Sequence, residues 1–349
     1  MLRTFLILFS SISLSFTGCA KKGTDAPGGS AVYDTTEKAT PVNITDANHF
    51  IYFRPKPGET YRYKITLNST AGAQTEDSLY HQFPPKELAT SINTYYLTQT
   101  VKQTKPDSSV EFSLAFDSVT MKLDKDTAHI KFSTNDPKTK NDPRFANFTL
   151  LTSESFGFSI NKYGDVQEIF NTASIINKYM KTFPDSVNTP TNRDKIKQSV
   201  EATIAEYLGR TMVRFPEKPL AKDTTISVSR EINIPVWQQI SLPMHLAATT
   251  RMDGFSERGG KVLASFTTRT VVTPTKDGVE DPAAKATLSN MTTNVTESVL
   301  VEDATGMLVH REIRDERSWD FMLQAKKKPE NFFKTHRSSK DITTVDLLK

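Results

Sequence analysis

The feature that most constrains the fold is an alternation of apolar and polar residues that recurs along much of the chain. In its clearest segment, Tyr61, Tyr63, Ile65 and Leu67 alternate with polar residues. Successive side chains of a β-strand point to opposite faces of the sheet, so this period of two indicates a strand with one buried face. The pattern predicts a mainly β protein.

Comparable segments predict further strands through the first half of the chain. They cover residues 93–103, 110–123, 129–132, 148–160 and 166–170. Residues 161–165 (Asn-Lys-Tyr-Gly-Asp) separate the last two segments and are typical of a turn. Short connections of this kind join antiparallel neighbours, so we expect an antiparallel sheet.

The second half returns to the same pattern after a proline-rich segment at residues 215–220. Strands are expected over residues 226–234, 236–252, 261–273, 287–302 and 307–322, with glycine-containing connections at 253–260 and 276–285. Asp303-Ala304-Thr305-Gly306 predicts a tight hairpin turn. The β-rich body spans residues 49–325, either as one unit or as two sub-domains, 49–170 and 211–325.

Between these halves the period becomes helical, over residues 173–209. Ile175, Ile176, Tyr179 and Met180 predict a short helix that ends before Pro184. A second helix is expected from about residue 191, and its apolar residues recur every four positions at Ile196, Val200, Ile204 and Leu208. Gly209 is expected as the residue that follows its end. The fold class is therefore a β-rich α+β protein, a large antiparallel meander or half-barrel with a helical insert.

The first nineteen residues indicate where the protein is located. Arg3 precedes a short apolar run, and Thr17-Gly18 stands directly before Cys19. This arrangement is typical of a secretory signal peptide, and the run is too short to span about 30 Å of hydrocarbon. The segment resembles a bacterial lipobox, with Phe16 where a branched aliphatic residue is usual. The resemblance implies cleavage after residue 18 and a diacylated Cys19.

Two segments outside the body are polar. Residues 19–48 are typical of a flexible tether. About 25 flexible residues have a root-mean-square reach of roughly 25–30 Å. Residues 326–349 are rich in Lys and Arg and predict a basic tail, interpreted as a frayed, solvated end rather than as a contact for anionic lipid or cell-wall polymer.

Charge and cysteine content exclude some classes of protein. The formal net charge is +4, and removal of Arg3 with the signal peptide leaves only a small positive excess. Such an excess on 349 residues argues against nucleic acid as a partner. Cys19 is the sole cysteine, so no intrachain disulfide can form and stability must come from packing.

Several segments together resemble lipoprotein domains of unknown function from Gram-negative bacteria. The segments that carry the resemblance are the lipobox, residues 56–63, 158–166 and 215–219, and the turn at 303–306. The resemblance implies a secreted, mostly β domain with no known activity. An Asp-x-Thr-Gly turn between long strands is also similar to periplasmic lipoprotein carriers, in which helices lie in the mouth of a curved half-barrel; this second likeness concerns architecture alone.

No local motif predicts catalysis, a cofactor or a metal ion. The six histidines are spaced too irregularly for an ordinary zinc site. Gly254-Phe255-Ser256-Glu257-Arg258 lacks the closing glycine of a nucleophile elbow. Two groups of carboxylates, Asp124 with Asp126 and Asp315 with Glu316 and Asp320, could bind calcium or act as an acid/base pair. Neighbouring Lys and Arg favour their interpretation as solvated charges.

Asp-[Ser/Thr] followed by a further residue, mostly small or apolar, recurs along the chain. The pattern resembles the acceptor of general O-glycosylation in some Gram-negative periplasms, and it also arises by chance in a chain rich in Ser and Thr. The candidate acceptors are Thr35, Ser78, Ser118, Thr127, Ser186 and Thr224.

These observations predict an outer-membrane lipoprotein of the cell envelope, on either membrane face, that is not an enzyme. The first hypothesis is a binding or carrier module whose curved sheet holds an apolar ligand or an envelope protein, with the second helix in its mouth. The second is a structural or assembly component of an envelope complex. A hydrolase is the third.

Overall fold

The computed structural model describes residues 39–44, 49–78, 87–125, 127–182, 188–237, 240–280 and 284–348. Fourteen strands follow one another in these segments: β1 (Thr40–Val42), β2 (Thr60–Asp77), β3 (Glu87–Thr104), β4 (Val110–Lys125), β5 (Ala128–Ser133), β6 (Ser155–Ile160), β7 (Val166–Phe170), β8 (Thr225–Trp237), β9 (Ile240–Arg258), β10 (Lys261–Pro274), β11 (Gly278–Glu280), β12 (Ala284–Glu302), β13 (Leu308–Ala325) and β14 (Phe332–Leu348). The α-helices are α1 (Ala146–Leu151), α2 (Ala173–Met180) and α3 (Pro190–Thr211).

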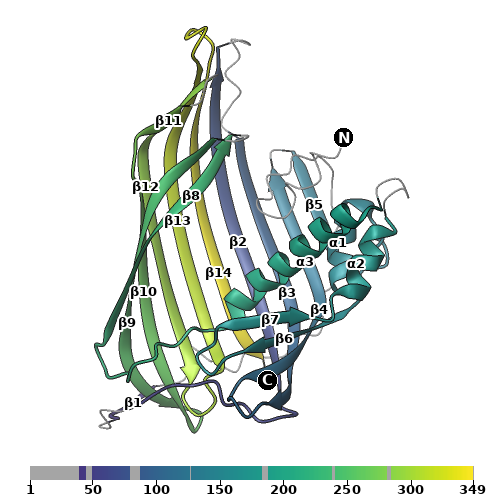
Figure 1. The fold of residues 1–349 in the computed structure, drawn as a ribbon, viewed down its shortest axis with the longest axis vertical. Helices are drawn as coiled ribbons and strands as arrows, with labels where there is room; N and C mark the ends of the chain where they lie inside the picture. The colour runs from purple at the N-terminus through teal and green to yellow at the C-terminus, as the bar shows by residue number, and fades with distance from the viewer. Residues whose placement is uncertain are drawn as a thin grey trace.

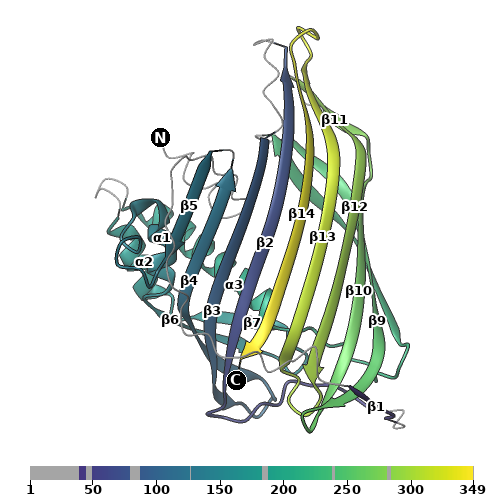
Figure 2. The ribbon, with the colours of Figure 1, turned by 180° about the vertical axis from the view of Figure 1, so that it is seen from behind.

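All the strands belong to one antiparallel sheet, as the alternation predicts. Its order is β1-β9-β10-β12-β13-β14-β2-β3-β4-β6-β7, while β8 also pairs with β9, β11 with β12 and β5 with β4. The sheet is open and curved, and Figures 1 and 2 show its long strands side by side with the helices on one face. Breaks in register, such as the one between Ser289 and Thr292 of β12, are β-bulges, which increase local twist and bend a sheet.

The two halves of the chain are joined by the last strand. β14 lies between β13 and β2, with Arg311 opposite Val345 on one side and Ile65 opposite Val345 on the other. The prediction of a frayed basic tail is therefore wrong. The misreading has a physical cause, because the central inward positions of β14 line an open part of the concave face and are polar, so the apolar alternation is weak there.

The helices cover part of the concave face of the sheet (Figure 1). Thr189 caps α3 by accepting a hydrogen bond from the backbone N–H of Asn192, and Pro190 fits the first turn. Val200, Ile204 and Leu208 of α3 are buried as predicted, and the partly buried Ile196 packs against the same core. α3 thus lies on the sheet along its predicted apolar face (Figure 1).

Three local predictions differ from the structure. Residues 148–151 of the strand expected over 148–160 belong to α1 instead, where Phe148 is buried close to Phe145 of the preceding 3₁₀ turn that Asp142 caps. α3 continues past Gly209 to Thr211. β9 extends through Gly254 to Arg258, so only Gly259 and Gly260, both at positive φ, form the connection to β10.

Apolar side chains gather in two clusters. The larger packs α1, α2 and α3 against the sheet around residues such as Phe112, Phe116 and Phe158. The smaller lies on strands alone and is centred on Leu242, Met244, Val272, Ala286, Leu288 and Phe321. Among the described residues, no helix is both long and apolar enough to cross a membrane.

Candidate functional site

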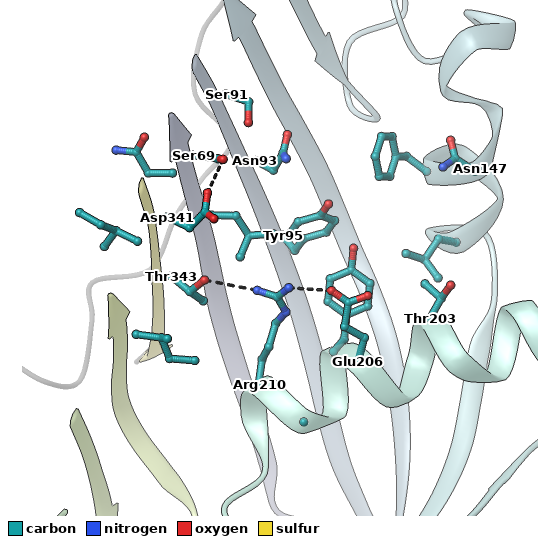
Figure 3. A pocket seen from close by; sticks show the side chains of 18 of the residues that line it. Ser69, Ser91, Asn93, Tyr95, Asn147, Thr203, Glu206, Arg210, Asp341 and Thr343 are labelled. Atoms are coloured by element: carbon teal, nitrogen blue, oxygen red, sulfur yellow. Dashed lines mark hydrogen bonds and ion pairs between the residues drawn. The ribbon is translucent and has the colours of Figure 1, made fainter. Parts of the chain in front are cut away.

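A cleft of about 630 Å³ lies between α3 and the concave face of the sheet. Its walls come from β2, β3, β13 and β14 on one side and from α1, α2 and α3 on the other. Polar side chains concentrate toward β13 and β14, and aromatic ones lie among β3, α1 and α3 (Figure 3). The cleft therefore has a polar end and an aromatic end.

Arg210 of α3 organises the polar end. Its Nη2 donates to Glu206 Oε1 at 2.7 Å, and its Nη1 donates to Thr343 Oγ1 at 3.4 Å. Nearby, the Ser69 hydroxyl donates to the Asp341 carboxylate across β2 and β14 (Figure 3). The Nε of Arg210 is buried and has no hydrogen-bond partner in the protein. A buried donor in this state favours an acceptor on a bound molecule.

Asn93 supplies a buried acceptor on the wall of the same cleft. Its inward neighbours on the adjacent strands are Leu67 and Met121, so an amide stands in an otherwise apolar row. The side chain is 9% exposed, and its Oδ1 has no hydrogen-bond partner in the protein. Leaving such an atom unpaired costs about 1–3 kcal/mol, so folding alone does not favour Asn at this position.

Tyr95 and Tyr207 form the aromatic end. Their ring centroids lie 4.8 Å apart, and Phe148 packs against Tyr95 at 6.2 Å. Burial raises the pKa of both phenols, that of Tyr207 well above its ordinary value, because a phenolate would lose its hydration there. Both tyrosines therefore stay neutral and present flat ring surfaces with hydroxyl groups.

The carboxylate groups singled out in the sequence do not form an acid/base pair. Asp315 faces the concave side and binds Arg317, whereas Glu316 binds Lys340 at 2.7 Å on the convex side. Asp320 also lies on the convex side and contacts His336 at 2.7 Å. Asp124 pairs with Lys122 and His129, at 2.8 and 2.7 Å, and its pKa is lowered mainly by the hydrogen bond from Lys122. Asp126 lies outside the described residues.

The histidines and Ser256 are likewise dispersed. Each described histidine contacts a different carboxylate, the pairs being His49–Asp303, His129–Asp124, His245–Glu231, His310–Asp346 and His336–Asp320. Ser256 sits within β9 and not at a strand-to-helix elbow. In the described part of the chain, no three His, Cys, Asp or Glu side chains are placed to hold a metal ion.

The modification sites fall in different surroundings. Thr127 is exposed, Thr224 is half-buried, and Ser78 is half-buried with its hydroxyl donating to the Phe332 carbonyl. Ser118 is 4% exposed within β4, so the folded body does not present its hydroxyl to a transferase. Cys19, Thr35 and Ser186 lie outside the described residues. Lipidation and glycosylation remain predictions.

Sequence reasoning missed the residues that define the cleft. The sequence of β3 alone carried no clear signal for Asn93, because Ser91 and Gln99 on the same face are polar too; its apolar partners Leu67 and Met121 are known only from the strand pairing. Glu206 and Arg210 do show the i, i+4 spacing of a helical ion pair. Nothing local indicated that Asp341 and Thr343 would join them, since β14 was not predicted.

The fold and the cleft define a mainly β protein with one open antiparallel sheet and a helix-covered concave face. The chain belongs to the family of unknown function DUF6263, whose sequence pattern matches residues 107–308. No curated protein matches the chain.

Solved structures give only remote likenesses. Lipovitellin, in a structure describing lipid–protein interactions, is 10% identical with a TM-score of 0.41; the match covers 84% of this chain, which spans 25% of the lipovitellin chain. An outer membrane channel from Pseudomonas putida F1 is 8% identical with a TM-score of 0.20, covering 87% of this chain and 99% of that one. At these scores neither likeness bears on function.

Proposed function

We propose that the protein is a non-enzymatic binding module of the cell envelope whose cleft holds a small organic molecule. The observation that carries the proposal is the pair of buried, unpartnered atoms on the cleft wall, Asn93 Oδ1 and Arg210 Nε. One needs a donor and the other an acceptor, so a ligand that carries both kinds of group would satisfy them together.

The remaining lining indicates the chemistry of this ligand. Tyr95 and Tyr207 offer ring faces, while Ser69, Asp341 and Thr343 offer hydrogen-bonding groups at the opposite end. A volume of about 630 Å³ corresponds to roughly twenty non-hydrogen atoms if each occupies about the 30 Å³ of a liquid water molecule. The best fit is a molecule of that size with one apolar face and several hydroxyl or amide groups.

Binding is favoured over hydrolysis because the cleft carboxylates are already engaged. Glu206 pairs with Arg210, Asp315 with Arg317, and Asp341 accepts from Ser69. A substrate would have to displace these partners before one of the carboxylates could act as a general base. The prediction of a purely apolar ligand is accordingly refined to an amphipathic one.

The ligand is sought by native mass spectrometry of full-length protein purified from membranes in mild detergent. We expect an adduct of several hundred daltons on wild-type protein that is absent from Asn93→Leu and retained by Thr94→Val, the adjacent outward-facing position. Wild-type protein that carries no adduct, or an adduct unaffected by Asn93→Leu, would overturn the proposal.

The cellular setting is a further part of the proposal. Cys19 is acylated after signal cleavage, and the polar residues between it and β1 let the body stand off the outer membrane on one face or the other. The predicted tether of residues 19–48 was too long, because Thr40–Val42 pair with β9. The test of the anchor is metabolic palmitate labelling of wild type and Cys19→Ala. Loss of label and release from the membrane in the variant support the anchor, whereas an unchanged label and membrane fraction contradict it.

A further inference from the structure

A second pocket lies farther along the concave face, among strands alone. It has a volume of about 230 Å³ and is lined by residues of β8, β9, β12, β13 and β14. β13 links it to the cleft described above, because Asp315 lines the cleft and the next inward residue, Arg317, lines this pocket. The Asp315–Arg317 ion pair thus stands between the two sites.

The body of this pocket is apolar. Leu242 and Met244 of β9 are 1% exposed, and Leu288 and Phe321 are 7% and 6% exposed. Ile234, Met291, Trp319 and Phe333 also line the pocket and are only partly buried, and Thr335 is a buried polar residue of the lining. An apolar ligand chain placed against this lining would gain about 0.8 kcal/mol for each of its methylene groups that is removed from water.

Two guanidinium groups border this apolar lining. Arg317 and Arg337 lie on the inward faces of the neighbouring strands β13 and β14, and Arg337 is directly opposite Trp319. Arg317 already binds Asp315, whereas Arg337 has no acidic partner in the part of the chain that the structure describes. An apolar pocket beside an uncompensated guanidinium is complementary to an apolar chain that ends in an anion.

We propose that this pocket binds a medium-chain fatty carboxylate, with its chain against the partly buried Ile234, Met291, Trp319 and Phe333 and its carboxylate against Arg337. At roughly 30 Å³ per methylene group, about 230 Å³ encloses about eight carbons, so a ten-carbon chain such as decanoate would leave its carboxylate end at the rim, beside the exposed Arg337. Charge complementarity selects the anion, since Arg337 and Arg317 bring two positive charges and Asp315 one negative charge. The site is separate from the cleft and does not depend on the ligand proposed for it.

The chain provides its own reporter for the test. Its two tryptophans are Trp237 and Trp319, so a Trp237→Phe background leaves Trp319 in the pocket as the single emitter. Full-length protein in this background is titrated with decanoate below its micellar concentration, and Trp319 emission is followed. Decanol is the matched ligand without charge. We expect a saturable blue shift with decanoate and binding of decanol weaker by about fivefold or more.

Arg337→Gln and Lys334→Gln form the matched pair of variants. Both remove one positive charge from β14, but residue 337 faces the pocket and residue 334 the opposite face. We expect Arg337→Gln to weaken the binding of decanoate about fivefold or more and to leave the affinity for decanol unchanged. Lys334→Gln should change neither affinity. Unfolding midpoints in urea establish that both variants are folded. Absence of a saturable response, equal affinity for decanol and decanoate, or equal effects of the two variants would each overturn the proposal.

Discussion

Arg311 Nη1 donates a hydrogen bond to the backbone carbonyl of Gly209 at 2.6 Å, joining β13 to the last turn of α3 across 102 residues of sequence. The same guanidinium also donates to the carbonyls of Arg210 and Met212 at 2.6 and 3.1 Å. Glu297 contacts its Nε at 2.9 Å. Arg311 therefore provides hydrogen-bond donors to the free backbone carbonyls at the C-terminal end of α3, where the helix dipole favours a positive charge. It also fixes the position of the helix that forms one wall of the cleft.

Replacing Arg311 by Met should destabilise the fold by about 3 kcal/mol, because it leaves helix carbonyls and Glu297 without their charged partner in a buried place. Arg311 is 6% exposed, and burial lowers the pKa of its guanidinium while Glu297 opposes that effect. Urea unfolding measures the loss. Arg314→Met, at an outward-facing and exposed position of the same strand, is the control and should change stability by less than about 1 kcal/mol.

Asn93→Leu should stabilise the ligand-free protein by about 1 kcal/mol. The substitution nearly preserves volume, removes an acceptor that has no protein partner, and continues the apolar row with Leu67 and Met121. The free energy of unfolding is measured on protein stripped of ligand by refolding. A loss of stability of 1 kcal/mol or more would indicate that Asn93 serves the fold and would remove the main reason for assigning the cleft a ligand.

Substitutions of Gly306 and Gly260 distinguish the cost of backbone strain from the cost of steric crowding. Both have positive φ, 69° and 73°. A Cβ at residue 306 would lie 2.4 Å from the backbone oxygen of Tyr52, whereas none of the described atoms lies within 4 Å of a Cβ at residue 260. Gly260→Ala should therefore cost about 1 kcal/mol from conformation alone and Gly306→Ala about 3 kcal/mol, compared by urea unfolding. Equal losses of stability in the two variants would show that the backbone at Tyr52 can move away from the added Cβ at little cost.

Strands whose inward positions are mostly apolar were predictable, whereas β14, whose central inward positions are polar, was not. β2 alternates because Tyr61, Tyr63 and Ile65 enter the main core. The inward positions of β14 include Arg337, Ser339 and Asp341. These polar residues contribute to the two sites, and they also remove the apolar alternation by which a strand is predicted. The turn at residues 303–306 was predicted from glycine chemistry, and the structure adds that Arg54 donates to the carbonyls of Asp303 and Ala304.

The cleft could not be predicted, because its parts come together only through the pairing of β14 with β2. Ser69 and Asp341 are 272 residues apart in sequence, yet they face each other across this strand pair. Local spacing carries no information about such contacts. The apolar face of α3 did predict that a helix would cover the sheet, but it gave no indication that Glu206 and Arg210 beside it would line a cleft.

The buried tyrosines should make the fold sensitive to alkali. Burial raises the pKa values of Tyr63, Tyr95 and Tyr207 above the ordinary value near 10. Their folded-state pKa values exceed those of the unfolded chain, so their contribution to stability is complete below about pH 10 and is lost as the pH rises further.

Each tyrosine of this kind can steepen the fall by up to about 1.4 kcal/mol per pH unit, and Tyr63→Phe should remove the share of one such group. Urea midpoints between pH 8 and pH 11.5 measure the slope, and absorbance at 295 nm follows ionisation. We expect part of the phenolate signal to appear only with unfolding. Complete ionisation near pH 10 while the circular dichroism stays native would contradict the burial of these rings.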